Sequence, residues 1–465
     1  MWQGLRGNAA AHPLPTFVDN ASFPAAFAVS ELAATSIGLA TQATAALINT
    51  SRPVEVNVRL ASRWFQHSFM PLNRPAPAMW DAFAGDYASC DGWIRLHTNA
   101  AHHRQTMEQV LGQHADRTSP AREVRRWAAG ELEQAIIDAG GCAAEMRSMA
   151  AWQQHPQGQA VAQEPLFAWQ TTGQAAAPEW QLPEARPLLG LRVLDLTRII
   201  AGPVATRFLA SLGADVLRID PLGWQEPSLD EEITCGKRRA VLDLKHPTDR
   251  EQFTRLLRGA DVLVHGYRAD ALERLGFDVA TRQALAPGLV DVSLNAWGWQ
   301  GPWRNRRGFD SLVQMGCGIA EQGMQWQRSD KPTPLPVQAL DHSTGYLLAA
   351  VLEGLRQRLA NGHGSQVRLS LARTAWLLQQ HPAAPGSDQS GILAKTEDNL
   401  PFFELTQWGL GVRLRAPSWL PGTAQLCATP GCLAGYAPGI MVNQASCCGS
   451  LLSSSSFTSP ESPHD

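Results

Sequence analysis

The chain lacks several features that would assign it to a particular class of protein. Lysine is scarce: Lys237, Lys245, Lys331 and Lys395 are the four among 39 Lys and Arg residues. These cations stand against 42 Asp and Glu, for a net charge of -3. This balance gives no support to a chain that binds nucleic acid or a membrane surface through overall basicity. Recognition of phosphate or carboxylate groups therefore depends on arginine.

Long hydrophobic runs are also missing. No stretch approaches the roughly 18 apolar residues of a membrane-spanning helix, and residues 1–15 lack the cationic start and apolar stretch of a secretory signal. We therefore expect a cytoplasmic protein. The 8 Cys residues show neither C-x-x-C pairs nor Cys/His spacing for zinc. We expect free thiols and no metal site.

Length and patterning predict several domains. The 465 residues suffice for about three average domains or two large ones. Residues 1–153 carry helix and strand signals, whereas residues 154–187 are rich in Gln, Ala and Pro and are expected to form a linker. Periodicity is lost beyond Pro417. We predict an irregular segment over 381–439 and a disordered, Ser-rich tail over 440–465.

Short apolar strands alternate with helices between residues 188 and 380. The predicted strands cover 193–196, 215–219, 240–244, 262–264 and 289–294, with helices over 204–212 and 246–258. Such alternation predicts a parallel sheet covered on both faces. The expected fold class is α/β, with a doubly wound, Rossmann-like large domain and a smaller α+β domain.

One order of elements occurs twice along the chain. A helix, an alternating strand and a helix that carries Trp are expected over 31–64 and again over 341–376. The recurrence suggests an internal duplication, although so simple an order also arises by chance.

The first predicted strand of the large domain leads into Thr197-Arg198-Ile199-Ile200-Ala201-Gly202-Pro203. Pro203 suits the first turn of a helix. Free N–H groups at that helix start would bind a phosphate or carboxylate, which Ala201 and Gly202 allow to approach closely. A tight turn without a ligand fits the same residues. So does an NAD site that uses Asp220, but the turn lacks the G-x-G-x-x-G pattern.

Two further clusters of basic residues adjoin predicted strands. Gly236-Lys237-Arg238-Arg239 precedes one strand, and Tyr267, Arg268 and Arg274 follow another. We expect both clusters at the edge of the sheet where ligands bind in such folds. Together they predict a ligand with several phosphates, with ordinary solvated surface charge as the alternative.

Asp341 stands where an extended, Pro-rich segment meets an apolar helix. A simple N-cap is one interpretation. The other is a carboxylate nucleophile at the positive end of the helix. His342 and Ser343 do not complete a hydrolase triad, because neighbouring helical residues point about 100° apart. The Trp-rich turn over 297–303 either lines an acyl pocket or fills the core.

Six segments between Leu188 and Trp376 occur in an order that is characteristic of one family. They read LRVLDLTRIIAGPVATRFLASLGADVLRID, GKRRAVLDLKHP, ADVLVHGYRADALERLG, WGWQGP, RGFDSLVQ and LDHSTG. In this order they resemble the class III CoA-transferase family, the CaiB/BaiF group. The preceding residues, from DGWIRLHT to AAWQQHPQ, are similar to the family's later part. The chain thus looks like a late half-copy fused ahead of an early half-copy.

The resemblance implies a CoA-transferase that moves CoA from an acyl-CoA donor to a carboxylic acid. Asp341 matches the family's nucleophile, which forms an aspartyl anhydride and then a thioester. The positions that match the CoA site are Arg198, Ile200, Ala201, Gly202, Arg238, Tyr267, Arg268 and Arg274. CoA would enter as a substrate thioester, with no permanently bound cofactor and no metal.

The resemblance also bears on partners. The expected partners are an acyl-CoA and a carboxylic acid, with no nucleic acid or membrane. The family's interlocked dimers imply a homodimer or an internally satisfied pseudo-dimer.

Departures from the family pattern narrow these expectations. Oxalate-using members carry Gln where Ile200 stands, so a small dicarboxylate donor is disfavoured. Racemases carry His where Phe309 stands, and Phe cannot remove and return a proton, so an acyl-CoA racemase ranks below transfer. The sequence is also compatible with a catalytically silent CoA-binding or partner subunit and, less readily, with an NAD-dependent oxidoreductase.

Glu31 falls near the N-terminal counterpart of Asp341 and is assigned no catalysis. A shifted reading frame would explain the residues after about 417.

Overall fold

The computed structural model describes residues 1–6, 13–116, 118–267, 270–384, 391–406 and 408–425. All of them belong to one compact unit, residues 1–432. The tail predicted as disordered, 440–465, lies outside the described residues. None of the helices within the described ranges is long and apolar enough to cross a membrane.

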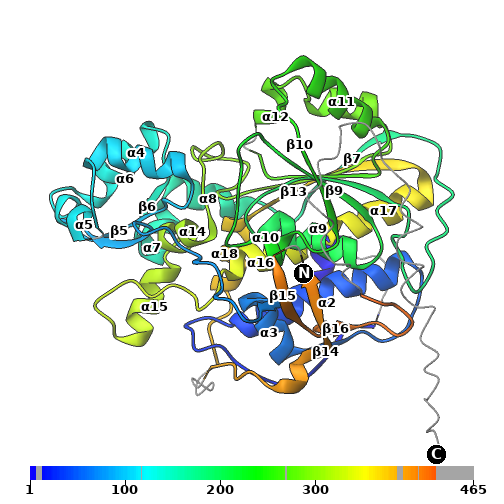
Figure 1. Ribbon diagram of the computed structural model, residues 1–465, viewed down its shortest axis with the longest axis horizontal. Helices are drawn as coiled ribbons and strands as arrows, with labels where there is room; N and C mark the ends of the chain where they lie inside the picture. Colours follow the sequence, from blue (N-terminus) through cyan, green and yellow to red (C-terminus); the bar gives the residue numbers. More distant parts are fainter. Residues whose placement is uncertain (7–12, 117, 268–269, 385–390, 407, 426–465) are drawn as a thin grey trace, which may run out of the picture. The chain divides into compact units, whose positions relative to one another are not determined.

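A seven-stranded sheet forms the centre of this unit (Figure 1). Its order is β10-β9-β8-β11-β12-β13-β7, and every pairing is parallel except that of β7. The strands are β7 (Ala168–Gln174), β8 (Arg192–Leu196), β9 (Asp215–Asp220), β10 (Lys237–Val241), β11 (Val262–His265), β12 (Val290–Asn295) and β13 (His363–Ser370). The chain winds outward from β8 in one direction and from β11 in the other, so the switch point lies between them. The predicted α/β fold class is confirmed.

Neighbouring residues of each strand face opposite sides of the sheet, which gives two cores. Val193 and Val262 pack in one core, whereas Leu194 and Leu263 pack in the other. Helices α9 (Ala201–Ser211), α16 (Ala339–Leu347) and α17 (Ala350–Asn361) cover the first core. Helices α11 (Pro247–Arg258), α12 (Ala271–Arg274) and α13 (Val279–Leu285) cover the second.

Helix α2 (Val29–Leu47) is buried along nearly its whole length. It packs against α16 and α17 and, on another side, against α3 (Val58–Gln66), so residues of the first half of the chain complete the core of the second half (Figure 1). Small elements surround it: α1 (Trp2–Arg6), a sheet of β1 (Thr16–Val18), β2 (Glu55–Asn57) and β16 (Ser418–Trp419), and a sheet of β3 (Phe69–Pro71), β14 (Asn399–Thr406) and β15 (Gly409–Leu414).

A smaller α+β region has a core of its own, which contains Phe83, Ile94 and Leu132. Its antiparallel sheet consists of β4 (Gly85–Ala88), β5 (Trp93–Leu96) and β6 (Ala143–Glu145), with helices α4 (Ala101–Leu111), α5 (Thr118–Val124) and α6 (Ala129–Asp138). The remaining elements are α7 (Met149–Gln154), α8 (Pro156–Gln163), α10 (Asp230–Ile233), α14 (Asp310–Gly316), α15 (Ile319–Gln327), α18 (Leu371–Gln379) and the short helix Thr396–Asp398.

Two segments differ from their predicted character. Residues 154–187, expected to be a linker, contain α8 and β7, and β7 pairs with β13. The sequence of β7 is polar and shows no clear period. Backbone hydrogen bonds to β13, rather than buried side chains, hold this strand at the edge of the sheet. The described part of 381–439, expected to be irregular, contains β14, β15 and β16.

Strand β10 begins three residues before its predicted start, at Lys237. Arg238 and Arg239 therefore lie inside the strand, paired in register with Leu217 and Arg218 of β9. Since β9 and β10 are parallel, Arg238 lies toward their amino ends. It does not lie at the carboxyl edge of the sheet, where the sequence predicted it.

Candidate active site

Asp341 is the third residue of α16 and borders two cavities. The helix is preceded by Gln338 at the N-cap position, so the simple N-cap interpretation of Asp341 is wrong. The residue is only 6% exposed. One cavity, of about 390 Å³, is also lined by Arg198, Tyr267 and three further arginines and is called the arginine cavity below. The other, of about 590 Å³, is lined by Trp80 and is called the Trp80 cavity.

A second carboxyl group lies directly beside Asp341. The backbone N–H of Asp341 donates to Oδ2 of Asp310 at 2.8 Å, and the amide of Gln314 donates to Oδ1. Burial raises the pKa of Asp310 to about 6. Burial, followed by the charge of Asp310, raises the pKa of Asp341 well above its usual value. Because both oxygens of Asp310 already accept hydrogen bonds, a proton held by the pair is better placed on Asp341.

The turn after β8 lines the same cavity as Asp341. Gly202, at the start of α9, has no room for a side chain, because a Cβ would lie 2.2 Å from Cβ of Thr197. Ile199 has a φ of 69°, an unfavourable value for a β-branched residue. Its N–H donates to Glu226 at 2.7 Å, which helps to hold this conformation. Strain of this kind often marks functional sites.

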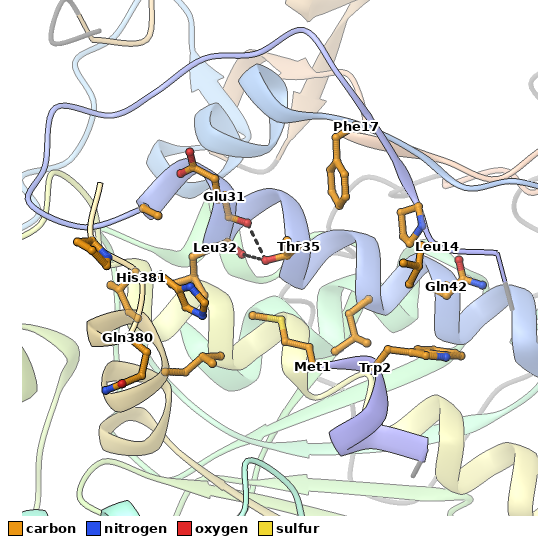
Figure 2. Close-up of a pocket in the computed structure, with 16 residues that line it drawn as sticks. Met1, Trp2, Leu14, Phe17, Glu31, Leu32, Thr35, Gln42, Gln380 and His381 are labelled. Carbon is orange, nitrogen blue, oxygen red and sulfur yellow. Dashed lines mark hydrogen bonds between the residues drawn. The ribbon is translucent and has the colours of Figure 1, made fainter. Parts of the chain in front are cut away.

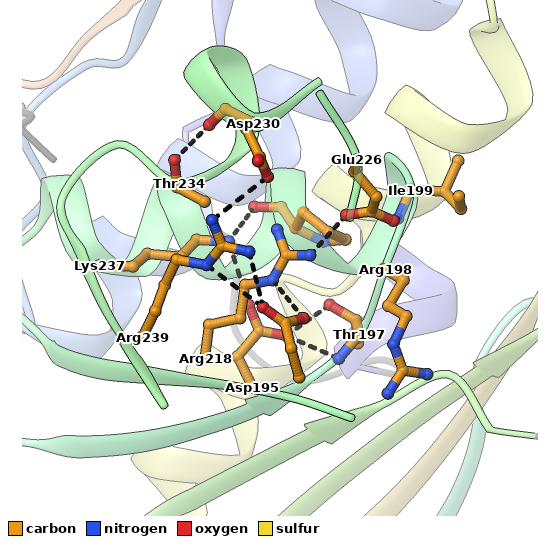
Figure 3. A network of polar contacts seen from close by, with 12 residues as sticks. Asp195, Thr197, Arg198, Ile199, Arg218, Glu226, Asp230, Thr234, Lys237 and Arg239 are labelled. Atoms are coloured by element: carbon orange, nitrogen blue, oxygen red, sulfur yellow. Dashed lines mark hydrogen bonds and ion pairs between the residues drawn. The ribbon is translucent and has the colours of Figure 1, made fainter. Parts of the chain in front are cut away.

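A buried polar network supports the turn from behind (Figure 3). Asp195 accepts hydrogen bonds from Thr197, Thr206 and the ammonium of Lys237, which also donates to the carbonyl of Pro203. Burial lowers the pKa of Lys237 to about 8. Burial alone would raise the pKa of Asp195, but Lys237 and the hydroxyl donors keep it below its usual value. The network therefore fixes the backbone between β8 and α9.

Arg198 points away from this network toward the arginine cavity (Figure 3). Its guanidinium donates to the hydroxyl of Tyr267 at 3.0 Å and stacks on the ring of Trp224 at 5.1 Å. Arg198 follows β8 and Tyr267 follows β11 in the chain. The pair therefore spans the switch point of the sheet, where doubly wound folds bind their ligands.

Three more arginines line the same cavity from the loop before α14. Arg306 pairs with Glu133 at 2.8 Å, and Arg307 donates to the carbonyl of Gly140 at 2.6 Å. Arg304 is exposed. Four guanidinium groups around one cavity at the carboxyl edge of a parallel sheet form a surface suited to a ligand with several phosphates.

The structure brings some of the sequence-predicted site residues together. Arg198, Ala201, Gly202 and Tyr267 line the arginine cavity with Asp341. Ile200 lies on the other side and lines the Trp80 cavity.

Three predicted residues are not part of this group. Arg238 forms an ion pair with Asp215, and it is not among the residues that line the arginine cavity. Arg274 is 70% exposed and pairs with Asp270 within the turn that leads into α12; its helical neighbour Ala271, rather than Arg274, lines the cavity. Arg268 lies outside the described residues.

The first half of the chain supplies a wall of aromatic and histidine side chains. His97 stacks on Phe309, with ring centroids 3.8 Å apart, and His103 meets the same ring edge-on. His102 and His103 line the arginine cavity, and His97 and His102 line the Trp80 cavity. Burial lowers the pKa values of His97 and His103 to about 3, so both rings are neutral at physiological pH.

Two questions that the sequence left open are answered by the geometry. Trp297 is fully buried and meets the ring of Trp303 edge-on, so it fills the core, which favours the core interpretation of this turn over the pocket interpretation. Asp220 is engaged by Arg218 at 2.9 Å and by Arg239 at 2.9 Å. Its carboxylate is therefore committed to arginine partners rather than placed for a ribose, which disfavours the NAD interpretation.

Glu31 lies at a different cavity, of about 600 Å³, on the outer side of α2 (Figure 2). That cavity is lined mainly by apolar residues, with His381 on the facing segment, and Asp341 is not among its lining residues. The position of Glu31 gives it no access to the carboxyl pair.

Several site residues escaped the sequence analysis. Asp310 stands in RGFDSLVQ, directly after Phe309, and its place at a helix start after a Gly was the available signal. The three arginines of WRNRRG directly follow the Trp-rich turn. His97 and His103 carried no local signal, because only tertiary packing brings them to Phe309. Within the described ranges, the His, Cys, Asp and Glu side chains form no group that could hold a metal ion.

Comparisons with known proteins match part of this chain to one family. The family described as CoA-transferase family III matches residues 188–401. An acyl-CoA transferase of Gibberella moniliformis is 29% identical over 366 residues, 71% of this chain and 63% of that protein. A succinate–glutarate CoA-transferase of Agrobacterium fabrum is 30% identical and covers 40% of this chain and 51% of its own length. The chain thus spans less than two thirds of the length of these relatives.

A crystal structure of Rv3272 from M. tuberculosis is 33% identical, covers 42% of this chain and 56% of its own, and superposes with a TM-score of 0.40. The family match itself spans β8 to β13 and includes Asp310 and Asp341. Residues 188–401 of this chain therefore match CoA-transferase family III.

Proposed function

We propose that the chain transfers CoA from an acyl-CoA donor to a carboxylic acid, with Asp341 as the nucleophile. The observation that carries this proposal is the position of Asp341 between two cavities, one lined by arginines and one largely by apolar and aromatic side chains. A CoA thioester has the same division into a polyanionic part and an acyl part, joined at the thioester. A substrate bound across both cavities presents its thioester carbon to Asp341.

The first half of the reaction moves CoA onto the enzyme. A carboxylate oxygen of Asp341 attacks the thioester carbon, the C–S bond breaks, and CoA leaves as a thiolate from a mixed anhydride. The thiolate then attacks the carbonyl carbon of Asp341. This step releases the donor acid as a carboxylate and leaves CoA bound to Asp341 as a thioester.

In the second half of the reaction the same two steps occur in reverse order, with the acceptor acid in place of the donor. The incoming carboxylate attacks the Asp341 thioester and displaces the thiolate, which forms a new anhydride. The thiolate attacks the acceptor's carbonyl carbon, so the acyl-CoA product leaves and Asp341 is regenerated as a carboxylate. Each step exchanges one bond at an acyl carbon and needs neither a redox cofactor nor a metal, so CoA enters only as substrate.

The surrounding residues have defined tasks in this scheme. Arg198 and Tyr267 would bind CoA phosphates, together with the exposed Arg304. The N-terminus of α16 favours negative charge on Asp341. Asp310 orients Asp341 through the hydrogen bond to its backbone. We propose acyl-CoA and a carboxylic acid as the partners, in a cytoplasmic protein, with the site completed by a homodimer or by the chain's own first half.

A catalytically silent CoA-binding subunit is the second candidate. The raised pKa of Asp341 favours it, because a protonated carboxyl group is a poor nucleophile. An acyl-CoA racemase is less favoured, because Phe309 lines the same cavity as Asp341 where the chemistry would require a second proton carrier. The predicted fused half-copy stays a prediction.

A trapping experiment distinguishes transfer from silent binding. The chain is incubated with acyl-CoA and then with hydroxylamine, which converts an Asp341 anhydride or thioester to a hydroxamate, and the peptide that carries Asp341 is analysed by mass spectrometry. Transfer predicts a hydroxamate at Asp341 in the wild-type chain and an unmodified peptide in the Asp341→Asn variant. CoA binding without any adduct would support the silent subunit instead.

A further inference from the structure

The Trp80 cavity borders Asp341 but is not lined by Arg304 or Arg306 of the basic loop. Its walls come from two separate parts of the chain. Pro77, Met79 and Trp80 precede β4 in the first half, and Pro227 and Leu229 lie in the loop between β9 and α10. Residues outside the family-matching segment therefore form part of the wall.

A second cavity, of about 580 Å³, adjoins this one. The two share a wall that includes Met79, Trp80, Ile200, Pro227 and Leu229. Beyond the shared wall the second cavity is lined by apolar side chains, among them Phe65, Phe69, Met70, Leu335 and Val337. Each cavity has the size of a typical ligand pocket, which begins at about 300 Å³. Either volume is large enough for a group much larger than an acetyl or oxalyl unit.

The charges around this space are already neutralised by partners within the protein. Among the described residues, Arg95 is the arginine that lines these two cavities. It donates to Asp86 at 2.7 Å and stacks on the ring of Trp80 at 4.8 Å. Glu231 and Glu232, which line the second cavity, form ion pairs with Arg74 and Arg207.

The remaining ionisable wall groups would not stabilise an anion. They include Asp81 and Glu226 as well as Asp310 and Asp341. Burial lowers the pKa values of the lining histidines, to about 3 for His97 and His342, and in the same direction for His67 and His102. A carboxylate at the end of an acyl group would therefore meet carboxylates and neutral rings, without an uncommitted cation.

We propose that these two adjoining cavities bind the acyl group and select an acyl-CoA whose acyl chain is long or bulky, apolar and uncharged. This inference rests on the proposed function, since it assigns the thioester to Asp341. It adds a substrate class and the residues that determine it. Leu229, Met79 and Trp80 set the length that fits, and the committed state of Arg95 excludes dicarboxylic donors.

Binding measurements separate this proposal from the proposed function. Free CoA, octanoyl-CoA and succinyl-CoA are titrated calorimetrically into the full chain that carries Asp341→Asn, which prevents covalent attack. We expect octanoyl-CoA to bind about tenfold or more tightly than free CoA, from burial of its methylene groups, and succinyl-CoA to gain no affinity. Absence of CoA binding would contradict the proposed function. CoA binding with equal affinity for octanoyl-CoA would contradict only the acyl assignment.

Two substitutions locate the selection in these walls. Leu229→Trp fills the shared wall and should remove most of the octanoyl advantage while free CoA binds within about twofold of its original affinity. Leu222→Trp is the matched control, because Leu222 lies in the same loop but is 80% exposed and lines neither cavity. Ser228→Arg adds an uncommitted cation and should give succinyl-CoA an affinity gain of about fivefold or more.

Unchanged free CoA affinity reports that each variant is folded. An octanoyl advantage that survives Leu229→Trp would overturn the acyl assignment. So would an equal loss of that advantage in Leu222→Trp.

Discussion

The backbone N–H of Asp341 donates a 2.8 Å hydrogen bond to Oδ2 of Asp310, a residue 31 positions before it in the chain. The contact ties the start of α16 to the start of α14 and places two carboxyl groups side by side in a buried site. Because neighbouring carboxylates resist simultaneous ionisation, the charge on Asp310 controls how readily Asp341 ionises. The reactivity of the proposed nucleophile is thus set by a residue that need not touch the substrate.

The first prediction concerns the pH dependence of acyl transfer. Asp341 must be ionised to attack, and the charge of Asp310 raises its pKa. Asp310→Asn removes that charge, so the pKa of Asp341 should fall and the acid limb of the rate–pH profile should move down by about one unit or more. Initial rates of hydroxamate formation, measured across pH, report the limb directly.

Asp310→Asn also weakens a hydrogen bond, so it needs a charge-neutral control. Gln314 donates to Oδ1 of Asp310, and Gln314→Met removes that contact while it leaves the carboxylate in place. The control should shift the acid limb much less than Asp310→Asn does, because the carboxyl group of Asp310 remains. A downward shift of similar size in Gln314→Met would show that the limb responds to packing rather than to charge.

The second prediction is that loss of the nucleophile stabilises the fold. The folded-state pKa values of Asp310 and Asp341 lie above the unfolded value of 3.8. Their contribution to stability is therefore present in full below that value and is lost as pH rises through about 6, where Asp310 ionises, and beyond. Asp341→Asn should raise the unfolding free energy at neutral pH by about 1–3 kcal/mol. Chemical denaturation of both proteins, repeated near pH 4, tests this, because the difference should shrink in acid.

The third prediction tests the close packing of α16 on α9. A Cβ on Gly345 would lie 2.5 Å from the carbonyl oxygen of Ala201. Gly345→Ala should push the two helices apart, cost about 1–3 kcal/mol of stability and displace Asp341 from the turn after β8. Gly92→Ala is the control, since a Cβ there meets nothing within 4 Å, and its effect should stay within about 0.5 kcal/mol. Equal melting temperatures for the two variants would refute the packing argument.

The fourth prediction concerns the arginine cavity. Arg304 is exposed at its rim, and Arg304→Gln should weaken CoA binding about threefold to tenfold and reduce its dependence on salt. Arg255→Gln is a matched control, because Arg255 is 60% exposed on α11 and does not line this cavity. Titration of CoA at low and high ionic strength distinguishes the two. A salt dependence that is lowered equally by both substitutions would point to general charge rather than to this site.

Local sequence patterns were enough to predict the parts of the site that lie on one strand–turn–helix unit. Arg198, Ala201 and Gly202 follow β8 directly, so strand periodicity and the Pro203 signal placed them correctly. Tyr267 was placed by the same rule on β11, and Asp341 by the helix that follows it. These assignments depended only on which residues come after an apolar strand or before an apolar helix.

Side-chain partners could not be predicted in the same way. Arg238 was expected at the ligand edge, but β10 starts three residues early and Asp215 engages its guanidinium. Asp310 and the His97–Phe309 stack depend on contacts between distant segments, which no periodicity encodes. The polar strand β7 was taken for a linker because its backbone, not its side chains, joins it to β13.

The strand β7 has a practical consequence for anyone who shortens the protein. A fragment cut at the boundary of the family match would begin at 188 and lose both β7 and α2. The edge of β13 would then expose unpaired backbone amide and carbonyl groups that can pair with other molecules. The apolar sides of α16 and α17 that α2 covers would be exposed to solvent. Such a truncated protein should aggregate when it is expressed, and boundaries for laboratory work should follow the folded unit instead of the family-matching segment.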